Sequence, residues 1–418
     1  MRIGFDVAQT CAPKAGCGWA ADLLAKALVA RAPEDEFFLY HHFGGWLNPD
    51  RSKGTHLSQP NVREPFRSMS VGAARKLWAA AAAGECALPG NPEILHANSY
   101  QAPKAGSAKL VFTVYDMSFW IHPEFTTEEN RLVCQEGTLD AVCRADGFVF
   151  ISQSARNEFE RIFPGFCDRQ NVAIAVAPLA SRFPNLSEPH SVISTGSWLA
   201  VGSLEPRKNY GALLDALEKY WERSQKRRQL VIAGGSGWKS EEIRQRISVL
   251  EGRGLVRYLG YVPEARLRQL YGESFALIFP SHYEGFGLPI VEAMSQGCPV
   301  ITRKNNSLEE VGGSAALYYN DTIQDLVETM IRLENLPELY LERSNLVLNR
   351  AKRFDWSLTA TIVLDLYHRA LNEIQKACMV QKSKVSWATH PLRALPPAIL
   401  IATNHMLFRG QGTSVWRD

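Results

Sequence analysis

The chain has 418 residues, of which 46% are hydrophobic and 21% charged, and its formal net charge is +3. This length exceeds one ordinary hydrophobic core, so we expect two globular domains. A net charge this small gives no reason to expect nucleic acid as a partner. No apolar run reaches the roughly 18 residues needed to cross a bilayer.

Short apolar, β-branched runs alternate with helical patterns in the first half of the chain. This alternation predicts βαβ units, in which a parallel sheet carries helices on both faces. The predicted strands are Arg2–Val7, Phe37–His41, Glu93–Ala97, Leu110–Tyr115, Gly147–Ile151 and Val172–Val176. The predicted helices are Trp19–Ala30, Ala73–Ala82, Thr127–Arg144 and Ser154–Ile162.

The pattern pauses at residues 184–191, which contain two prolines and lack periodicity, so we interpret them as a linker. After the linker the alternation resumes, which predicts a second doubly wound domain facing the first across a cleft. Its predicted strands are Trp198–Gly202, Leu230–Ala233, Val256–Leu259, Ala276–Phe279 and Val300–Thr302. Its predicted helices are Tyr210–Tyr220, Glu241–Leu250, Glu264–Tyr271 and Leu288–Gln296.

A long helical pattern, Trp356–Ala377, follows Asp355, which is a suitable N-cap. The residues after it lose the alternation, and we expect a peripheral tail. The predicted division is therefore 1–190 for the first domain, 191–376 for the second with its closing helix, and 377–418 for the tail.

The N-terminal residues predict a strand and lack the layout of a signal peptide. The cysteines show no C-x-x-C pair and no metal-like spacing with histidine, so we expect reduced thiols and no structural zinc. These features predict a cytoplasmic protein. The eight cysteines are at positions 11, 17, 86, 134, 143, 167, 298 and 378.

Arg207 and Lys208 lie between a predicted strand and a predicted helix at the start of the second domain. Two fixed cations at the carboxyl end of a strand would neutralise a diphosphate without a metal ion. A lone basic pair is more often a solvated helix start, but this pair lies where open α/β sheets bind ligands. We therefore predict that it binds phosphate.

A glycine-rich segment, 234–237, follows the next predicted strand. Its spacing fits neither G-x-G-x-x-G nor a P-loop. A structural turn and a platform for a nucleotide base both remain open for this segment.

Glu284 and Glu292 bracket a glycine-rich helix entrance. Such an entrance directs backbone N–H groups and the positive end of the helix dipole at a ligand. Glu284 would then accept hydrogen bonds from a hexose and Glu292 from a ribose, whereas a plain helix-face contact is the alternative for Glu292. The residues predicted to meet the ligand here are Glu284, Gly285, Phe286, Gly287, Leu288 and Glu292.

In combination these segments resemble retaining glycosyltransferases of family four, which have the two-domain GT-B fold. The resemblance spans residues 1 to about 376 and is most specific in the second domain. The matching segments there are VGSLEPRKN (201–209), LVIAGGSGW (230–238), EGFGLPIVEAMSQGCPVI (284–301), NSLEEVGG (306–313) and FDW (354–356). Looser matches are IGFDVAQ…AGCGW (3–19), EILHANS (93–99), FTVYDMSF (112–119) and FVFISQSARNEF (148–159).

The resemblance implies that the second domain holds a nucleoside-diphosphate sugar and that the first domain holds most of the acceptor. It implies retention of anomeric configuration through a short-lived ion pair, in which the leaving diphosphate helps to deprotonate the acceptor. It implies no metal ion and no other cofactor. The residues carried over by position are Arg207 and Lys208 for the diphosphate, Glu284 for the hexose, Glu292 for the ribose, and the loop containing Gly16 and Gly18 beneath the diphosphate.

The chain departs from the family at Tyr115, where a histidine often precedes the aspartate that is here Asp116. A tyrosine with a pKa of about 10 is not an acid or base at neutral pH. Asp116 is therefore our candidate for part of that catalytic role, with His96 as a second candidate that is more often structural. Glu124 follows in a loop that we expect to touch the acceptor.

Residues 65–78 mix basic and aromatic side chains. On a helix they would suit the anionic inner face of the cytoplasmic membrane, as a peripheral contact. An ordinary surface helix is an equally good interpretation of this segment.

Together these features predict a metal-independent hexosyltransferase for a bacterial-type surface glycan, such as the lipopolysaccharide O-antigen, with a glycan or lipid-linked oligosaccharide as acceptor. GDP-mannose is the favoured donor because segments 205–209 and 233–238 resemble mannosyltransferases; UDP-glucose and UDP-N-acetylglucosamine would use the same motifs. The alternatives are a GT-B epimerase of nucleotide-sugars and a non-catalytic scaffold. A nicotinamide-dependent oxidoreductase lacks its G-x-G-x-x-G after the first strand.

Overall fold

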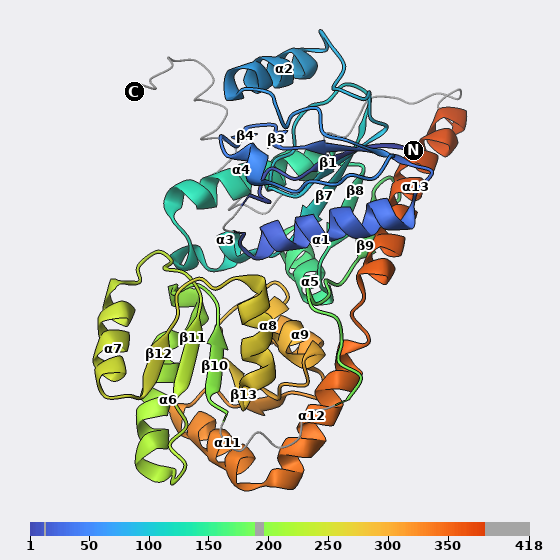
Figure 1. The fold of residues 1–418 in the computed structure, drawn as a ribbon. Coiled ribbons are helices and arrows are strands. Elements are labelled where there is room, and N and C mark those ends of the chain that lie inside the picture. Colours follow the sequence, from blue (N-terminus) through green and yellow to red (C-terminus); the bar gives the residue numbers. More distant parts are fainter. Residues whose placement is uncertain (12–13, 189–195, 381–418) are drawn as a thin grey trace.

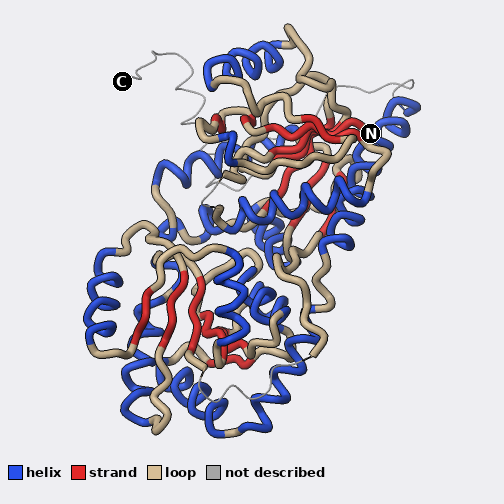
Figure 2. Tube along the Cα trace, viewed as in Figure 1, coloured by secondary structure: helices blue, strands red, loops and turns tan. Residues whose placement is uncertain are grey.

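The computed structural model describes residues 1–11, 14–188 and 196–380. Two α/β units lie one above the other, each built on its own parallel sheet (Figure 1). Figure 2 shows the two sets of strands in red with helices around them. Residues 189–191 of the predicted linker and 381–418 of the predicted tail lie outside the described residues.

The first sheet has seven parallel strands in the order β5-β2-β1-β6-β7-β8-β9. Its strands are β1 Arg2–Asp6, β2 Glu36–Tyr40, β5 Val62–Arg63, β6 Ile94–Ala97, β7 Lys109–Val114, β8 Gly147–Phe150 and β9 Ala173–Val176. A separate antiparallel hairpin joins β3 His42–Phe43 to β4 Trp46–Leu47. The helices are α1 Gly16–Arg31, α2 Val71–Ala83, α3 Ser118–Ile121, α4 Glu128–Arg144 and α5 Gln153–Ile162, with short 3-10 turns at Arg51–Lys53 and Pro123–Phe125.

The second sheet has six parallel strands in the order β12-β11-β10-β13-β14-β15. They are β10 Trp198–Val201, β11 Leu230–Ala233, β12 Val256–Tyr258, β13 Ala276–Phe279, β14 Val300–Arg303 and β15 Leu317–Tyr319. The helices are the 3-10 turn η3 Pro206–Lys208, then α6 Tyr210–Arg223, α7 Glu241–Gly252, α8 Glu264–Glu273, α9 Leu288–Ser295, α10 Asn306–Gly312, α11 Ile323–Asn335 and α12 Pro337–Ala351. The strand order reverses between β10 and β13, and ligands of open α/β sheets bind at such a switch point.

The predicted fold class, two doubly wound α/β units, is confirmed. Strands such as β11 and β13 are buried throughout, which explains their continuous apolar sequences. Side chains cap several helices as the sequence favours: Ser152 accepts the N–H of Ala155 at the start of α5. The prediction missed β5, β15, the β3–β4 hairpin, α3 and α10 to α12. Several of these are too short for a periodic pattern to be recognised.

The last described helix, α13 Trp356–Val380, returns to the first unit (red in Figure 1). It packs against α1 and against β7, β8 and β9, where Leu366 is fully buried. The predicted N-cap is confirmed, because Asp355 Oδ1 accepts the N–H groups of Ser357 and Leu358. The chain therefore crosses between the units twice. The division at residues 190 and 376 stays a prediction. Within the described ranges no helix is long and apolar enough to span a membrane.

Candidate active site

The loops that follow β10 and β13 meet the loop that follows β7 between the two units. Gly285 marks the contact, because a Cβ at this position would lie 2.0 Å from the backbone oxygen of Tyr115. Ser152, from the first unit, donates a hydrogen bond of 2.7 Å to the Gly285 carbonyl. Only glycine permits this approach. Gly285 therefore allows the loop after β13 to contact the first unit.

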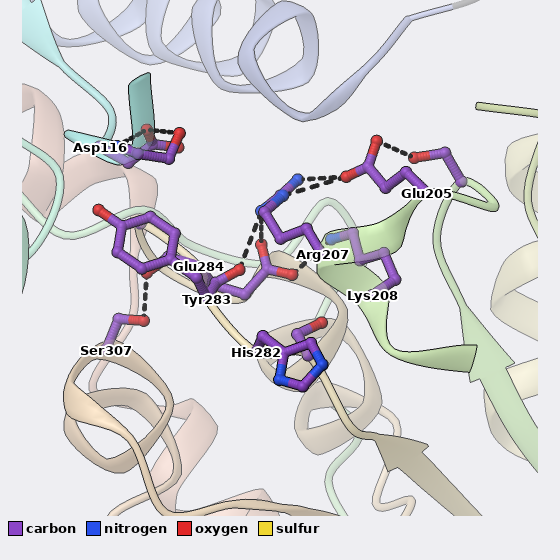
Figure 3. A network of polar contacts seen from close by, with 12 residues as sticks. Asp116, Glu205, Arg207, Lys208, His282, Tyr283, Glu284 and Ser307 are labelled. Carbon is purple, nitrogen blue, oxygen red and sulfur yellow. Dashed lines mark hydrogen bonds and ion pairs between the residues drawn. The ribbon is translucent and has the colours of Figure 1, made fainter. Parts of the chain in front are cut away.

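Arg207 and Lys208, on the 3-10 turn after β10, both bind Glu284 (Figure 3). Arg207 Nη1 lies 2.6 Å from Glu284 Oε2, and Lys208 Nζ lies 2.5 Å from Glu284 Oε1. Glu205 holds the other edge of the guanidinium, with Oε1 at 3.1 Å from Nε and 2.7 Å from Nη2. The structure thus brings together three predicted site residues and adds Glu205, which lies in the same predicted motif.

The charged groups of this cluster shift one another's pKa values. Burial alone would raise the pKa of Glu284, but the adjacent Arg207 and Lys208 lower it overall. Burial, together with the like charge of Arg207, lowers the pKa of Lys208 despite its carboxylate partners. Burial opposes the charge of Arg207, yet Glu284 and Glu205 raise its pKa overall. The cluster therefore contains one permanent cation and one that is more easily deprotonated than a free lysine.

The helix entrance after Glu284 has the geometry that the sequence predicts. Gly287 adopts a left-handed conformation with φ of +109° and begins α9, with Pro289 in the first turn. Ser307 donates a hydrogen bond of 2.5 Å to the Glu284 carbonyl and fixes the preceding loop (Figure 3). Phe286 is buried and Leu288 is partly buried. The first backbone N–H groups of α9 and its dipole therefore lie next to the charged cluster.

Glu292 has different partners from Glu284. Arg182 binds it with two hydrogen bonds, Nε to Oε1 at 2.7 Å and Nη2 to Oε2 at 3.1 Å. The hydroxyl of Tyr271 donates to Oε2 at 3.0 Å. Only 1% of the Glu292 side chain is exposed. The sequence prediction missed Arg182 and Tyr271 because no local motif links them to a glutamate 110 and 21 residues away.

Asp116, in the loop after β7, lies against the loop that carries Glu284 (Figure 3), since a Cβ on Gly285 would be 2.9 Å from Asp116 Cβ. Its Oδ1 accepts the backbone N–H of Ser118 at 2.9 Å and the Ser118 hydroxyl at 2.7 Å. The hydroxyl of Tyr100 donates to the Asp116 carbonyl at 2.9 Å. The charge of Asp116 contributes to the raised pKa of Arg207, after the larger contributions of Glu284 and Glu205.

Tyr115 and His96 are both buried in the first unit. Burial raises the pKa of Tyr115 well above its usual value, so its hydroxyl stays protonated near neutrality. His96 is fully buried and bonds Tyr367 of α13 through Nδ1 and Thr113 through Nε2, the latter at 2.7 Å. Burial lowers its pKa to about 3. His96, the second candidate beside Asp116, thus packs from β6 against α13 in the core of the first unit, in agreement with the structural interpretation.

The predicted loop with Gly16 and Gly18 forms the start of α1. Burial and the charge of Asp116 raise the pKa of Cys17 to about 12, while Arg207 opposes the shift, so this loop lies near both groups. Glu124 lies further out, on an exposed turn, where its carboxylate pairs with His122 at 3.1 Å. That histidine packs against the ring of Tyr283. Glu124 thus belongs to the rim of the contact between the units.

The glycine segment 234–237 packs against the loop that carries Glu205. The N–H of Gly237 donates to the Leu204 carbonyl at 3.1 Å, and the N–H of Leu204 donates to the Gly235 carbonyl at 2.9 Å. These bonds favour the structural turn, and a role as a base platform remains a prediction.

A groove of about 620 Å³ lies on the first unit, between the β3–β4 hairpin, α4 and residues 101–103. Trp46 at its edge is 39% exposed. In the adjoining helix α2, Trp78 is buried, as is the preceding Phe66, so neither aromatic ring is available to a membrane surface. Among residues 1–11, 14–188 and 196–380 no cluster of three or more His, Cys, Asp or Glu side chains has the geometry to hold a metal ion.

Comparisons with known proteins agree with this geometry. Residues 197–349 match the family described as Glycosyl transferases group 1. The chain is 30% identical over 271 residues to the O-antigen chain mannosyltransferase B of Escherichia coli, covering 62% of this chain and 70% of that protein. It is 29% identical to the serotype-specific mannosyltransferase WbdA of Escherichia coli over 58% of this chain, but it spans only 31% of that longer protein.

The fold also has close counterparts among solved structures. Sucrose-phosphate synthase from Thermosynechococcus elongatus superimposes with a TM-score of 0.63 at 18% identity. The match covers 88% of this chain and 98% of that protein.

Proposed function

This chain belongs to the glycosyl transferases group 1 family and has the GT-B fold, and from this premise we propose that it transfers mannose from GDP-mannose to a lipid-linked glycan. The product would be a bacterial surface polysaccharide of the O-antigen type. Support for mannose comes from the relatives, which are named as mannosyltransferases. The chain spans less than a third of WbdA. The substrates of that whole protein therefore enter here only as part of the proposal.

The observation that carries the proposal is the paired cluster of Arg207, Lys208 and Glu284 at the entrance of α9. A diphosphate in front of α9 would meet two cations and the N-terminal N–H groups. Glu284, already oriented by both cations, would accept hydrogen bonds from hydroxyls of the hexose. The two cations would stabilise the charge that grows on the leaving diphosphate, which is an electrostatic form of catalysis.

In this proposal the bond between the anomeric carbon and the diphosphate breaks to form a short-lived ion pair. The acceptor hydroxyl then bonds to the anomeric carbon on the same face, and its proton passes to the leaving diphosphate. The configuration is thereby retained. Asp116 lies against Gly285, next to Glu284, where a carboxylate would stabilise positive charge at the reacting sugar. No metal ion or other cofactor has a part in these steps.

The acceptor would approach from the first unit, and we place its sugar chain in the groove beside Trp46. Exposed aromatic rings provide flat apolar surfaces, and the groove also offers the carboxylates of Glu136 and Asp140. A contact with the inner face of the membrane would depend on the exposed Arg75 and Lys76 of α2 and would therefore weaken with salt.

Thermal unfolding with a panel of nucleotide-sugars tests the donor assignment. A ligand that binds only the folded protein at about 100 times its Kd stabilises it by about 2.7 kcal/mol. We expect GDP-mannose to raise the Tm more than UDP-glucose, UDP-N-acetylglucosamine or GMP. Nuclear magnetic resonance of the slow hydrolysis reaction should show α-mannose as the first product. Conversion of the nucleotide-sugar into an isomer would instead indicate an epimerase, and no shift with any nucleotide would indicate a scaffold.

A further inference from the structure

Arg182 lies in the segment that leads out of the first unit after β9 and forms the fork on Glu292 described above. Its side chain is 11% exposed. Burial lowers the pKa of an arginine, but the charge of Glu292 raises that of Arg182 overall. A two-point fork of this kind fixes the plane of the carboxylate as well as its charge.

The same guanidinium stacks on the first unit. Its carbon lies 4.4 Å from the ring centroid of Trp19, which is on α1 directly after the Gly16–Gly18 loop. Arg182 is thus held between α1 of one unit and α9 of the other. A stacked guanidinium requires the planar group of arginine, so lysine does not replace it.

The backbone around Arg182 is anchored on both sides. The Ser181 hydroxyl bonds that of Ser295 in α9 at 2.9 Å, and Trp356 at the start of α13 donates to the Ser181 carbonyl at 3.0 Å. The N–H of Leu186 donates to the Ser295 carbonyl at 2.9 Å. The position of Arg182 therefore depends on the first of the two connections between the units.

Arg182 and Glu292 still have hydrogen-bonding groups that no partner in the described part of the chain uses. An ionised carboxylate has about four acceptor sites. Arg182 and Tyr271 use three of those on Glu292, which leaves one on Oε1. Among the described residues no acceptor bonds Nη1 of Arg182. The free acceptor site on Oε1 matches one hydroxyl that donates to it, whereas Nη1 lies on the edge of the guanidinium that faces away from Glu292.

We infer that Arg182 is a positioning residue of the donor site, which orients Glu292 for a ribose hydroxyl of the nucleotide and, through Trp19, links that orientation to the contact between the units. The inference rests on the proposed function, because it requires a ribonucleotide donor. A simple structural ion pair would add little to stability and would not distinguish one nucleotide from another.

Isothermal titration of GDP and 2′-deoxy-GDP tests this role, because the two ligands differ by one ribose hydroxyl. The wild-type protein should bind GDP about tenfold more tightly, since a hydrogen bond to a charged group has about this effect. Arg182→Lys keeps the charge but loses the fork and the stacking, so the ratio of the two Kd values should fall towards one. Tyr271→Phe, which removes a single hydrogen bond from Glu292, should lower the ratio less.

Arg169→Lys is the matched control, because Arg169 also stacks on an aromatic ring, Phe166, at 4.5 Å. Its ratio should equal that of the wild type. Thermal unfolding of every variant separates altered recognition from lost folding. If Arg182→Lys does not fold, Tyr271→Phe gives the deciding ratio.

If Arg182→Lys weakens the binding of both ligands equally, so that the ratio of the two Kd values is unchanged, the positioning role is overturned and the proposed function is left intact. The same holds if Tyr271→Phe, as the deciding variant, keeps the wild-type ratio. If the wild type binds UDP and not GDP, the same ratio is measured with UDP and 2′-deoxy-UDP. Failure of all four nucleotides to bind the wild type would overturn both the inference and the proposed function.

Discussion

The two sides of the cleft are built in different ways. On the side of the second unit, Arg207 and Lys208 and their partner Glu284 form a largely buried network of ion pairs. On the side of the first unit, Asp116 is the predicted catalytic residue that faces them, and its neighbour Tyr115 is buried. In the proposed function the second unit therefore recognises the charged donor, and the first unit faces it with Asp116 and holds the acceptor.

In the proposed function this difference separates the site of the donor from the site of the acceptor. A diphosphate always presents the same charges, so its site needs fixed cations in a fixed arrangement. An acceptor glycan is neutral or variable, and loops and grooves suit it better than ion pairs. We expect substitutions on the second unit to affect the donor and those on the first unit to affect folding or the acceptor.

The largest effect should come from Glu284→Gln. Loss of its charge removes the group that we assign to the hexose and leaves Arg207 and Lys208 without their shared partner. We expect kcat to fall by about 100-fold or more, in the range seen when a preorganised hydrogen-bonding group is removed. The Kd of the nucleoside diphosphate should not rise, because the two cations are no longer neutralised by Glu284.

Steady-state kinetics and titration calorimetry separate these two quantities. Glu338→Gln is the control, because Glu338 is exposed on α12. A Glu284→Gln variant that retains full kcat would remove Glu284 from the catalytic cluster.

A middle-sized effect concerns His96, which we place in the core of the first unit. Its pKa is about 3 in the folded state against about 6.5 in the unfolded chain. Between these values the unfolded chain binds more protons, so this contribution to stability falls as the pH falls below about 6.5. Between pH 7.5 and 5.5 the loss should be about 1 kcal/mol.

Denaturant unfolding of the wild type and His96→Gln at both pH values measures this loss. The variant should be less stable but should lack this part of the pH dependence. Its kcat, measured on the folded fraction, should stay within about threefold of the wild type. If the stability of His96→Gln depends on pH in the same way as that of the wild type, the burial of a neutral histidine at position 96 is contradicted.

The smallest effect should come from Trp46→Ala at the groove of the first unit. An exposed aromatic ring contributes about 0.5 to 1.5 kcal/mol to a stacked contact. We therefore expect the KM for a long glycan acceptor to rise by about two- to tenfold, with no change in the Kd of the donor. Kinetics with acceptors of increasing length check this. Equal KM values for wild type and variant at every length would remove the groove from the acceptor site.

The second unit shows how far the sequence could predict the site. Residues 205–208 and 284–292 are contiguous segments, so their spacing and helix-start chemistry are sufficient to predict that Arg207, Lys208 and Glu284 belong to one cluster. The partnership of Arg182 with Glu292 joins residues that are 110 positions apart, and only the folded chain brings them together. Local patterns identify the charged groups but not how those groups are paired.

The first unit shows why the rest could not be predicted. Strand β6 is buried on both faces, so its sequence does not alternate and gives no indication of which side chains face the cleft. The sequence therefore could not show that His96 bonds α13, a helix from the far end of the chain, instead of facing the cleft. The hairpin with Trp46 consists of strands of two residues each, too short for any periodic signal.

Calorimetric titration of GDP into the wild type, Lys208→Ala and Lys219→Ala tests the central claim most directly. Lys208 is buried in the charged cluster, whereas Lys219 is exposed on α6. We predict that Lys208→Ala raises the Kd at least about tenfold, as expected for the loss of a charge-assisted hydrogen bond, and that Lys219→Ala leaves it unchanged. Equal affinity in all three proteins would contradict the assignment of this cluster to a diphosphate.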